Sequence, residues 1–179
     1  MKKNLSDIKL VCKHKKIKYE QYRISPLDIK VKKYLKVFEY FLYYAPNVAF
    51  KKVKINEAKW ENTYDEFINK DESLTQYSVI YAKDKKNVDY YSNLGLDGKS
   101  ICFECNRMVL KKGAGENKLT TLLRHIRNAL AHGNLYYNRK GKVDIFFLED
   151  LCEGTITAKM VITGDHLLSL KKLIEKNIK

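Results

Sequence analysis

The sequence predicts a mostly α-helical domain that ends in a short β-hairpin and a final helix. The chain has 179 residues, which is the length of one domain, and 45% of them are hydrophobic, enough to build a core. It has only 8 Gly and 2 Pro and no low-complexity linker, so we expect residues 1–179 to form a single domain. Its parts would be a basic N-terminal segment (1–24), a helical core (25–135), a hairpin (143–162) and a C-terminal helix (165–178).

The first helices of the predicted core have clear start signals. Residues 1–24 could be short strands or one helix. The sequence SPLD at 25–28 places serine, proline and aspartate where a helix start favours them, and apolar residues then recur at helical spacing up to Pro46. A second helix fits 56–69, whereas 77–82 could be helix or strand.

Two further helices complete the predicted core. The spacing of apolar residues predicts a helix over 99–112, which the glycines of 113–115 would end. The clearest helix covers 116–131, and Gly133 is well placed to cap its C-terminus.

The C-terminal part of the chain is predicted to be a hairpin followed by a helix. The runs 143–148 and 155–162 are rich in β-forming residues, and 149–154 between them is typical of a hairpin connection. An amphipathic helix then begins at Asp165.

The net charge of +14 predicts an affinity for polyanions such as RNA, since 35 basic residues stand against 21 acidic ones. Most of the surplus is lysine, so AT-rich codons offer an alternative explanation. No apolar run approaches the roughly 20 residues of a membrane span, and the N-terminus lacks the apolar stretch of a signal peptide. We therefore expect a cytoplasmic protein with no membrane partner.

The four cysteines predict neither a metal site nor a bound cofactor. Of Cys12, Cys102, Cys105 and Cys152, only the pair in Cys102-Phe103-Glu104-Cys105 has the spacing of a metal or redox pair. A zinc site needs a second such pair or suitably spaced histidines, and the sequence predicts no such partner. We expect reduced thiols in the cytosol, one or two of them in the core.

The segment with the most chemical potential lies at the end of the clearest helix. On a helical wheel at about 100° per residue, positions 119–132 separate into two faces. One face is apolar and consists of Leu119, Leu122, Leu123, Ile126, Ala129 and Leu130. The opposite face carries Arg124, His125, Arg127, Asn128 and His132. Asn128 and His132 are four residues apart, so they can form a hydrogen bond.

Arg127 and His132 are the proposed catalytic pair, with Asn128 in support. They are five residues apart, about 140° around an ideal helix. They could reach one phosphate if the helix loosened at His132, or if a second copy of the helix packed across a two-fold axis. The remaining polar residues, Arg124, His125 and Asn134, are candidates for substrate binding.

These residue types suit the cleavage of RNA. Histidine titrates near neutral pH and can take a proton from a ribose 2′-OH or give one to the leaving 5′-oxygen. Arginine can hold two phosphate oxygens, and asparagine can fix the imidazole tautomer. The expected products are a 2′,3′-cyclic phosphate and a 5′-OH, with no metal involved, because the chain offers no clustered carboxylates for a two-metal site.

The string LRHIRNALAHGN at 123–134 resembles the HEPN superfamily, whose signature is an arginine, commonly a polar residue, and a histidine after four to six residues. It is most similar to a plasmid- and island-borne HEPN subfamily in which such a segment precedes a hairpin and a final helix. The resemblance implies a HEPN-like helical bundle that forms a homodimer with both motifs in one cleft. It also implies a metal-independent endoribonuclease, usually with an antitoxin or another partner protein in toxin–antitoxin or anti-phage (abortive infection) systems.

The resemblance leaves three points open. Some relatives add an acidic residue from another helix, for which Glu39 and Glu104 are both candidates. One toxin branch carries a modified tyrosine two residues after the histidine, but Asn134 stands there and Tyr136 and Tyr137 are out of register. The protein could also be a non-catalytic RNA-binding or complex-assembly HEPN module, or a plain helical interaction protein.

Overall fold

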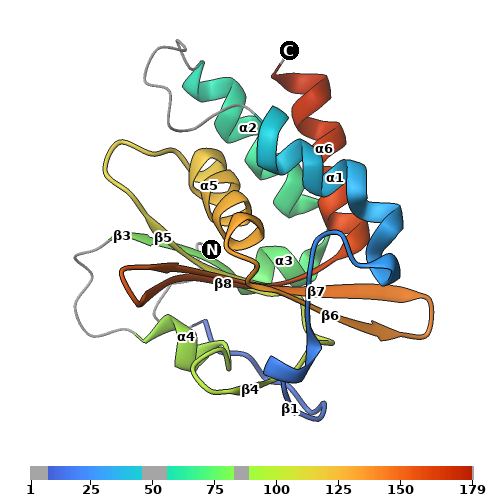
Figure 1. Cartoon of the computed structure of the whole chain (residues 1–179). Coiled ribbons are helices and arrows are strands. Elements are labelled where there is room, and N and C mark those ends of the chain that lie inside the picture. The colour runs from blue at the N-terminus through green and yellow to red at the C-terminus, as the bar shows by residue number, and fades with distance from the viewer. Residues whose placement is uncertain (1–7, 46–55, 83–88, 179) are drawn as a thin grey trace.

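The computed structural model describes residues 8–45, 56–82 and 89–178. Within them a six-stranded sheet runs in the order β2-β6-β7-β8-β5-β3, and a separate pair joins β1 to β4 (Figure 1). All neighbouring strands are antiparallel except β3 and β5, which are parallel. The strands are β1 (Ile17–Lys18), β2 (Arg23–Ile24), β3 (Ser78–Ala82), β4 (Ser100–Ile101), β5 (Arg107–Lys112), β6 (Leu135–Lys140), β7 (Val143–Cys152) and β8 (Thr155–Thr163).

Most of the helices cover one face of this sheet, above it in Figure 1, while α4, β1 and β4 lie below. The α-helices are α1 (Leu35–Glu39), α2 (Glu57–Asn69), α3 (Glu72–Tyr77), α4 (Tyr90–Asn93), α5 (Lys118–Ala131) and α6 (Gly164–Asn177). Shorter turns of other types are the 3₁₀ helices η2 (Glu20–Tyr22) and η3 (Ile29–Tyr34) and the π-helix η4 (Tyr40–Tyr44). Every helix among the described residues is too short or too polar to cross a membrane.

The prediction of a mostly α-helical bundle was therefore wrong, and the fold is mixed α/β. The predicted helix over 99–112 is two strands, β4 and β5, joined by a cysteine-containing turn. The predicted hairpin exists as β7 and β8, but it lies in the middle of the sheet between β6 and β5. The sheet thus draws strands from the N-terminal segment, the predicted helical core and the hairpin.

Several predicted elements are confirmed. The helix over 56–69 is α2, the helix over 116–131 is α5, and the final helix is α6. The ambiguous segment 77–82 contains β3. The first helix is really three consecutive pieces, η3, α1 and η4, and its N-cap is Asp28, whose side chain accepts the Lys30 N–H, and not Ser25.

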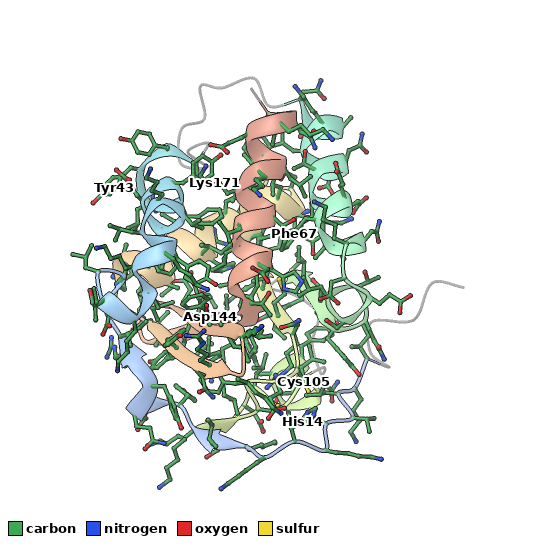
Figure 2. The ribbon with its side chains drawn as sticks, turned by 90° about the vertical axis from the view of Figure 1, so that its right-hand side faces the viewer. His14, Tyr43, Phe67, Cys105, Asp144 and Lys171 are labelled. Carbon is green, nitrogen blue, oxygen red and sulfur yellow. The ribbon has the colours of Figure 1, made fainter. Side chains whose placement is uncertain are left out.

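Strand β7 separates the two halves of the core because its side chains alternate between the faces of the sheet. Phe146 and Leu148 pack against the helices, in a core with residues of α1, α2, α5 and α6. Ile145 and Phe147 point to the opposite face, where they pack with Tyr19, Tyr90 and Phe103 in a second core. Figure 2 shows this division: Phe67 lies among the helices, and Cys105 and His14 lie at the other end of the molecule.

The start of α6 packs closely against Tyr34, the last residue of η3. A Cβ added at Gly164 would overlap the Tyr34 side chain. The Tyr34 hydroxyl donates a hydrogen bond to Asp144 Oδ2 at 3.0 Å, and Tyr137 donates to Asp144 Oδ1 at 2.7 Å. The small size of Gly164 therefore allows the contact that ties the first helical segment to β7.

We expect Gly164→Ala to lower the free energy of unfolding by about 1–3 kcal/mol, the usual cost of overpacking a core. The methyl group must displace the Tyr34 ring and its hydrogen bond to Asp144. Urea unfolding followed by circular dichroism measures the difference. Gly98→Ala is the control, since its nearest non-neighbour atom would lie 3.8 Å from the added Cβ. Equal stability of the two variants would contradict this packing role.

Candidate functional site

Helix α5 lies on the sheet with its apolar side down, as its hydrophobic pattern predicts. Its N-cap is Asn117, whose side-chain oxygen accepts the Thr120 N–H at 2.8 Å. The helix contacts β7 and β5 of the sheet and α2 beside it. The buried apolar residues are the six that the helical wheel places on one face: Leu119, Leu122, Leu123, Ile126, Ala129 and Leu130.

Only a small part of the second half of α5 and of its C-cap is exposed to solvent. We call it the exposed strip: Arg127, Ala131 and the C-cap residue His132. The side chains of Arg127 and His132 make no hydrogen bond or ion pair with the part of the chain that the structure describes. A guanidinium and an imidazole are thus available to a ligand at this end of the helix.

The C-terminus of α5 is closed by a Schellman motif. The Asn134 N–H donates to Ala129 O at 2.9 Å, and the Gly133 N–H donates to Leu130 O at 3.2 Å. Gly133 has φ +64°, so the predicted capping role of this glycine is confirmed. The His132 N–H still donates to Asn128 O at 2.9 Å, so helical hydrogen bonding continues as far as His132.

Arg23 of β2 holds the turn that follows His132. Its Nε donates to Gly133 O at 2.9 Å, and its Nη2 donates to Asn134 Oδ1 at 2.9 Å. The side-chain oxygen of Asn134, a candidate for substrate binding, is therefore engaged by Arg23. Nothing in the sequence signals this contact, because it joins residues more than a hundred positions apart.

A buried carboxylate, Asp150 of β7, lies beneath α5. Its Oδ2 is 2.6 Å from His125 Nδ1 and accepts a hydrogen bond from Asn128 Nδ2 at 3.3 Å. The other ring nitrogen of His125, Nε2, is 2.9 Å from Lys111 O. His125 is 0% exposed, so this predicted substrate-binding residue lies in the interior. Asn128 is half-buried and contacts Asp150, whereas the sequence suggested a hydrogen bond to His132.

Asp150 stands at an irregularity of the sheet. The register between β7 and β8 shifts between Asp150 and Leu151, as in a β-bulge. Its Oδ1 is buried and has no hydrogen-bond partner among the described residues. Sequence reasoning missed Asp150, because it placed residues 149–154 in a hairpin connection, where a carboxylate would be exposed.

Arg124, in the middle of α5, is fixed by an ion pair with Glu116, which lies just before the helix. Its Nε and Nη2 donate to the two oxygens of Glu116 at 2.5 and 2.9 Å, and Nη2 also donates to Lys111 O at 3.0 Å. Burial of the Glu116 carboxyl acts to raise its pKa, but hydrogen bonds from Arg124, the Gly113 N–H and Thr121 outweigh it and lower the pKa. The polar face of α5 therefore divides into an internal part and the exposed strip.

The two acidic residues considered from the sequence lie elsewhere. Glu39 lines a cleft of about 500 Å³ between the first helical segment and α6, together with Tyr40, Lys171 and Ile174. Glu104 lies in the turn between β4 and β5, close to His14 and Lys140. The acidic residues that contact residues 123–134 are Glu116, which pairs with Arg124, and Asp150, which contacts His125 and Asn128.

A second group of reactive side chains comes from two segments that are almost ninety residues apart in the sequence. Cys12 and His14 lie beside Cys102 and Cys105, and Figure 2 shows His14 and Cys105 at the opposite end of the molecule from Phe67. Sequence reasoning missed this cluster. The available signal was the close spacing of Cys12 and His14, which could have been considered as ligand partners of Cys102 and Cys105.

The comparisons with known proteins place the chain in a family. A family model described as HEPN pEK499 p136 matches residues 3–179, nearly the whole chain. No curated protein and no solved structure matches it. This match confirms the resemblance to HEPN proteins that residues 123–134 indicated.

We expect Glu116→Gln to lower the free energy of unfolding by about 1–3 kcal/mol near pH 7, because it removes a charged partner of Arg124. The folded-state pKa of Glu116 lies below its ordinary value of 4.5. Its charge therefore stabilises the fold fully above pH 4.5, and this contribution is lost as the pH falls through the folded-state pKa. Urea unfolding from about pH 7 to about pH 3 measures the gap between wild type and variant, which should shrink with acid.

The exposed carboxyl of Glu153 provides the control, since Glu153→Gln should leave stability nearly unchanged at every pH. A gap between Glu116→Gln and wild type that stays constant down to acid pH would contradict the assigned ion pair.

Proposed function

This chain belongs to the HEPN pEK499 p136 family, and from that premise we propose that it is an endoribonuclease whose chemistry uses Arg127 and His132 without a catalytic metal. The observation that carries the proposal is the division of the polar face of α5. Arg124, His125 and Asn128 are engaged inside the protein, whereas Arg127 and His132 are exposed and unpaired among the described residues. A guanidinium and an imidazole that the fold does not use are suited to a phosphodiester.

In the proposed reaction, His132 takes the proton from a ribose 2′-OH. The 2′-oxygen forms a bond to phosphorus as the bond from phosphorus to the 5′-oxygen breaks, and the 5′-oxygen receives a proton from a protonated His132. Arg127 holds the non-bridging oxygens while charge builds up on them. The products are a 2′,3′-cyclic phosphate and a 5′-OH, and DNA is not a substrate because it lacks the nucleophile.

In this proposal the residues around the pair hold the helix in place and do not contact the RNA. We propose that Asn128 supports the site by linking the helix to Asp150. Arg124, His125 and Asn134, which the sequence assigned to substrate binding, would hold the helix and its C-terminal turn in place through Glu116, Asp150 and Arg23. In this proposal the direct contact to RNA belongs to the exposed strip.

We further propose that two copies form the working enzyme. Arg127 and His132 are about 140° apart on an ideal helix, so one helix does not direct both side chains to one point. A second copy of α5 across a two-fold axis would place two such pairs in one cleft. In cells, such an enzyme fits a toxin–antitoxin or anti-phage system with a protein partner that restrains it.

We expect His132→Ala and Arg127→Ala each to reduce cleavage of single-stranded RNA by at least about 10²-fold, the usual value of one proton-transfer group or oxyanion contact. Cleavage is measured in buffer without divalent cations, and the 3′ ends are mapped for the cyclic phosphate. An RNA with a single 2′-deoxy nucleotide at the cleaved position should resist cutting.

Lys172→Ala is the matched control, because it removes one exposed positive charge from α6 and should keep the activity. Circular dichroism should show all three variants folded, since none of these side chains is buried. If RNA binds but no cyclic phosphate forms even with wild type, the protein is instead a non-catalytic RNA-binding or assembly module. Unchanged rates in both alanine variants would refute the proposal.

The two-copy site predicts how activity responds to mixing. Wild type is refolded or co-expressed with an Arg127→Ala/His132→Ala double variant, and cleavage is measured against the wild-type fraction. If both protomers build one cleft, activity should fall as the square of that fraction, to about one quarter in an equal mixture. A linear fall, or a monomeric mass by light scattering, would contradict a shared cleft.

A further inference from the structure

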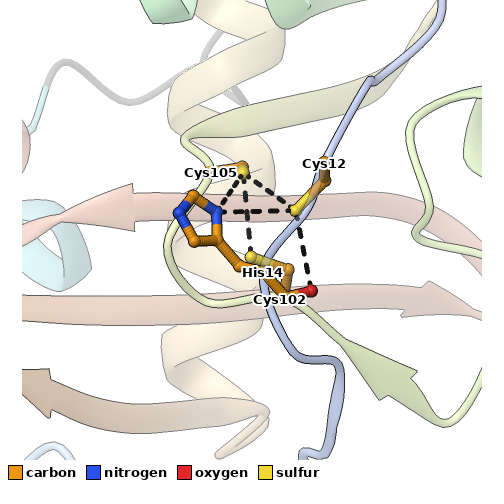
Figure 3. Close-up of side chains that lie close together, drawn as sticks. All are labelled: Cys12, His14, Cys102 and Cys105. Atoms are coloured by element: carbon orange, nitrogen blue, oxygen red, sulfur yellow. Dashed lines mark hydrogen bonds between the residues drawn. The ribbon is translucent and has the colours of Figure 1, made fainter.

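Three sulfur atoms and one imidazole lie close together in one cluster (Figure 3). Cys12 and His14 come from the N-terminal segment, and Cys102 and Cys105 come from the turn between β4 and β5. Their ligand atoms all lie within 4.8 Å of one another. Two segments separated by almost ninety residues thus bring one set of metal-ligand side chains to one point.

The spacing of these atoms fits one tetrahedral ion. Zinc binds sulfur at about 2.3 Å and histidine nitrogen at about 2.0–2.1 Å, so neighbouring ligands lie about 3.8 Å apart for two sulfurs and about 3.5 Å apart for sulfur and nitrogen. Here Cys102 Sγ and Cys105 Sγ are 3.7 Å apart. His14 Nδ1 is 3.5 Å from Cys105 Sγ and 3.7 Å from Cys12 Sγ. Cys12 Sγ and Cys105 Sγ, at 3.2 Å, are closer than this ideal.

The turn that carries two of the cysteines is held rigid by Arg107. This arginine is 0% exposed, and its Nη1 donates to the carbonyl oxygens of Cys102 and Cys105 at 2.8 and 2.6 Å. The Glu104 N–H also points at Cys102 Sγ, at 3.2 Å. Rigid backbone and an N–H directed at sulfur are the support that metal-bound thiolates require.

The buried charge of Arg107 also favours an anionic cluster beside it. Its hydrogen bonds go to backbone carbonyls, and no carboxylate pairs with it among the described residues. A buried cation without an anion is costly. Three thiolates and a neutral histidine around Zn²⁺ carry a net charge of −1, which would balance this arginine.

The orientation of His14 agrees with a ligand role. Its Nδ1 faces the sulfurs, while Nε2 lies 3.6 Å from Glu104 Oε2. A ligating histidine usually directs its second ring nitrogen to a carboxylate or carbonyl, which fixes the tautomer. Lys140 forms an ion pair with the same carboxylate and holds it in place.

We propose that Cys12, His14, Cys102 and Cys105 bind one Zn²⁺ ion as a structural site. Four protein ligands fill the tetrahedral shell, so no position remains for a substrate or a catalytic water. Binding releases the thiol protons and fastens the N-terminal segment to the sheet. That segment continues through β1, which pairs with β4, to Arg23, which holds the turn after His132.

The test is the metal content of the full chain purified without chelators from zinc-containing medium. Native mass spectrometry and elemental analysis should find one zinc per chain, and cobalt exchanged into the site should give the visible absorption of tetrahedral thiolate coordination. His14→Ala should lose most of the zinc while remaining folded, because its side chain is 49% exposed. His14→Cys should retain it.

Cys105→Ser should lose zinc, and Cys152→Ser is the matched control that should keep it, because Cys152 lies at the end of β7 outside the cluster. Less than about one tenth of an equivalent of metal in folded wild type would overturn the proposal. A Cys12–Cys105 disulfide in the intact mass would also overturn it. Metal content is independent of RNA cleavage, so this proposal and the proposed function can fail separately.

Discussion

The buried carboxylate of Asp150 determines how α5 lies on the sheet. A carboxylate in the interior must be paired, because the cost of leaving it without a partner is large. Here the partners are His125 and Asn128, three residues apart on one side of the helix, and their contacts fix its rotation. With the apolar residues also directed at the sheet, Arg127 and His132 are left facing solvent. The outward position of the proposed catalytic pair is therefore a consequence of the internal contacts between α5 and Asp150.

The same helix end is also fixed from a distant part of the chain. The Schellman turn after His132 is held by Arg23 of β2, a short strand that pairs with β6 at the end of the N-terminal segment. That segment has little regular structure, and its backbone is joined to the rest through β1 and through the Leu10 and Tyr19 N–H groups, which donate to Asn93 O and Lys99 O. A metal ion bound at Cys12 and His14 would compensate for this small number of contacts. It would thus order the turn beside the proposed catalytic residues without entering the proposed chemistry.

The sequence was sufficient to predict a helix where one face of the helix is polar and the other apolar. Helices α5, α2 and α6 were predicted on that basis. The sequence also identified β7 and β8, from their β-forming residues and the connection between them, although both faces of β7 are buried. It failed at β5, because this strand is covered on both faces: residues 107–110 are all buried, and a continuous buried run lacks the two-residue alternation that distinguishes a strand from a helix. The error at β5, with the unrecognised β6, turned a mixed sheet into a predicted helical bundle. In the site, the helical wheel identified the polar face of α5 but could not divide it, because Asp150, Glu116 and Arg23 reach it from other parts of the chain.

Because the polar face of α5 is divided in this way, the effect of a substitution on the proposed activity can be separated from its effect on stability. A positively charged helical face is ordinarily solvated and carries no specific role. On α5 the polar residues that the fold requires are already paired: Arg124 with Glu116, and His125 with Asp150. Substituting those residues would disturb the packing of the helix, and a loss of activity would then be ambiguous. Arg127 and His132 have no such partners among the described residues, so the fold gives no reason for a guanidinium and an imidazole at those two positions. A ligand that needs both a cation and a proton acceptor would explain these two side chains. A phosphodiester with a neighbouring 2′-OH is such a ligand.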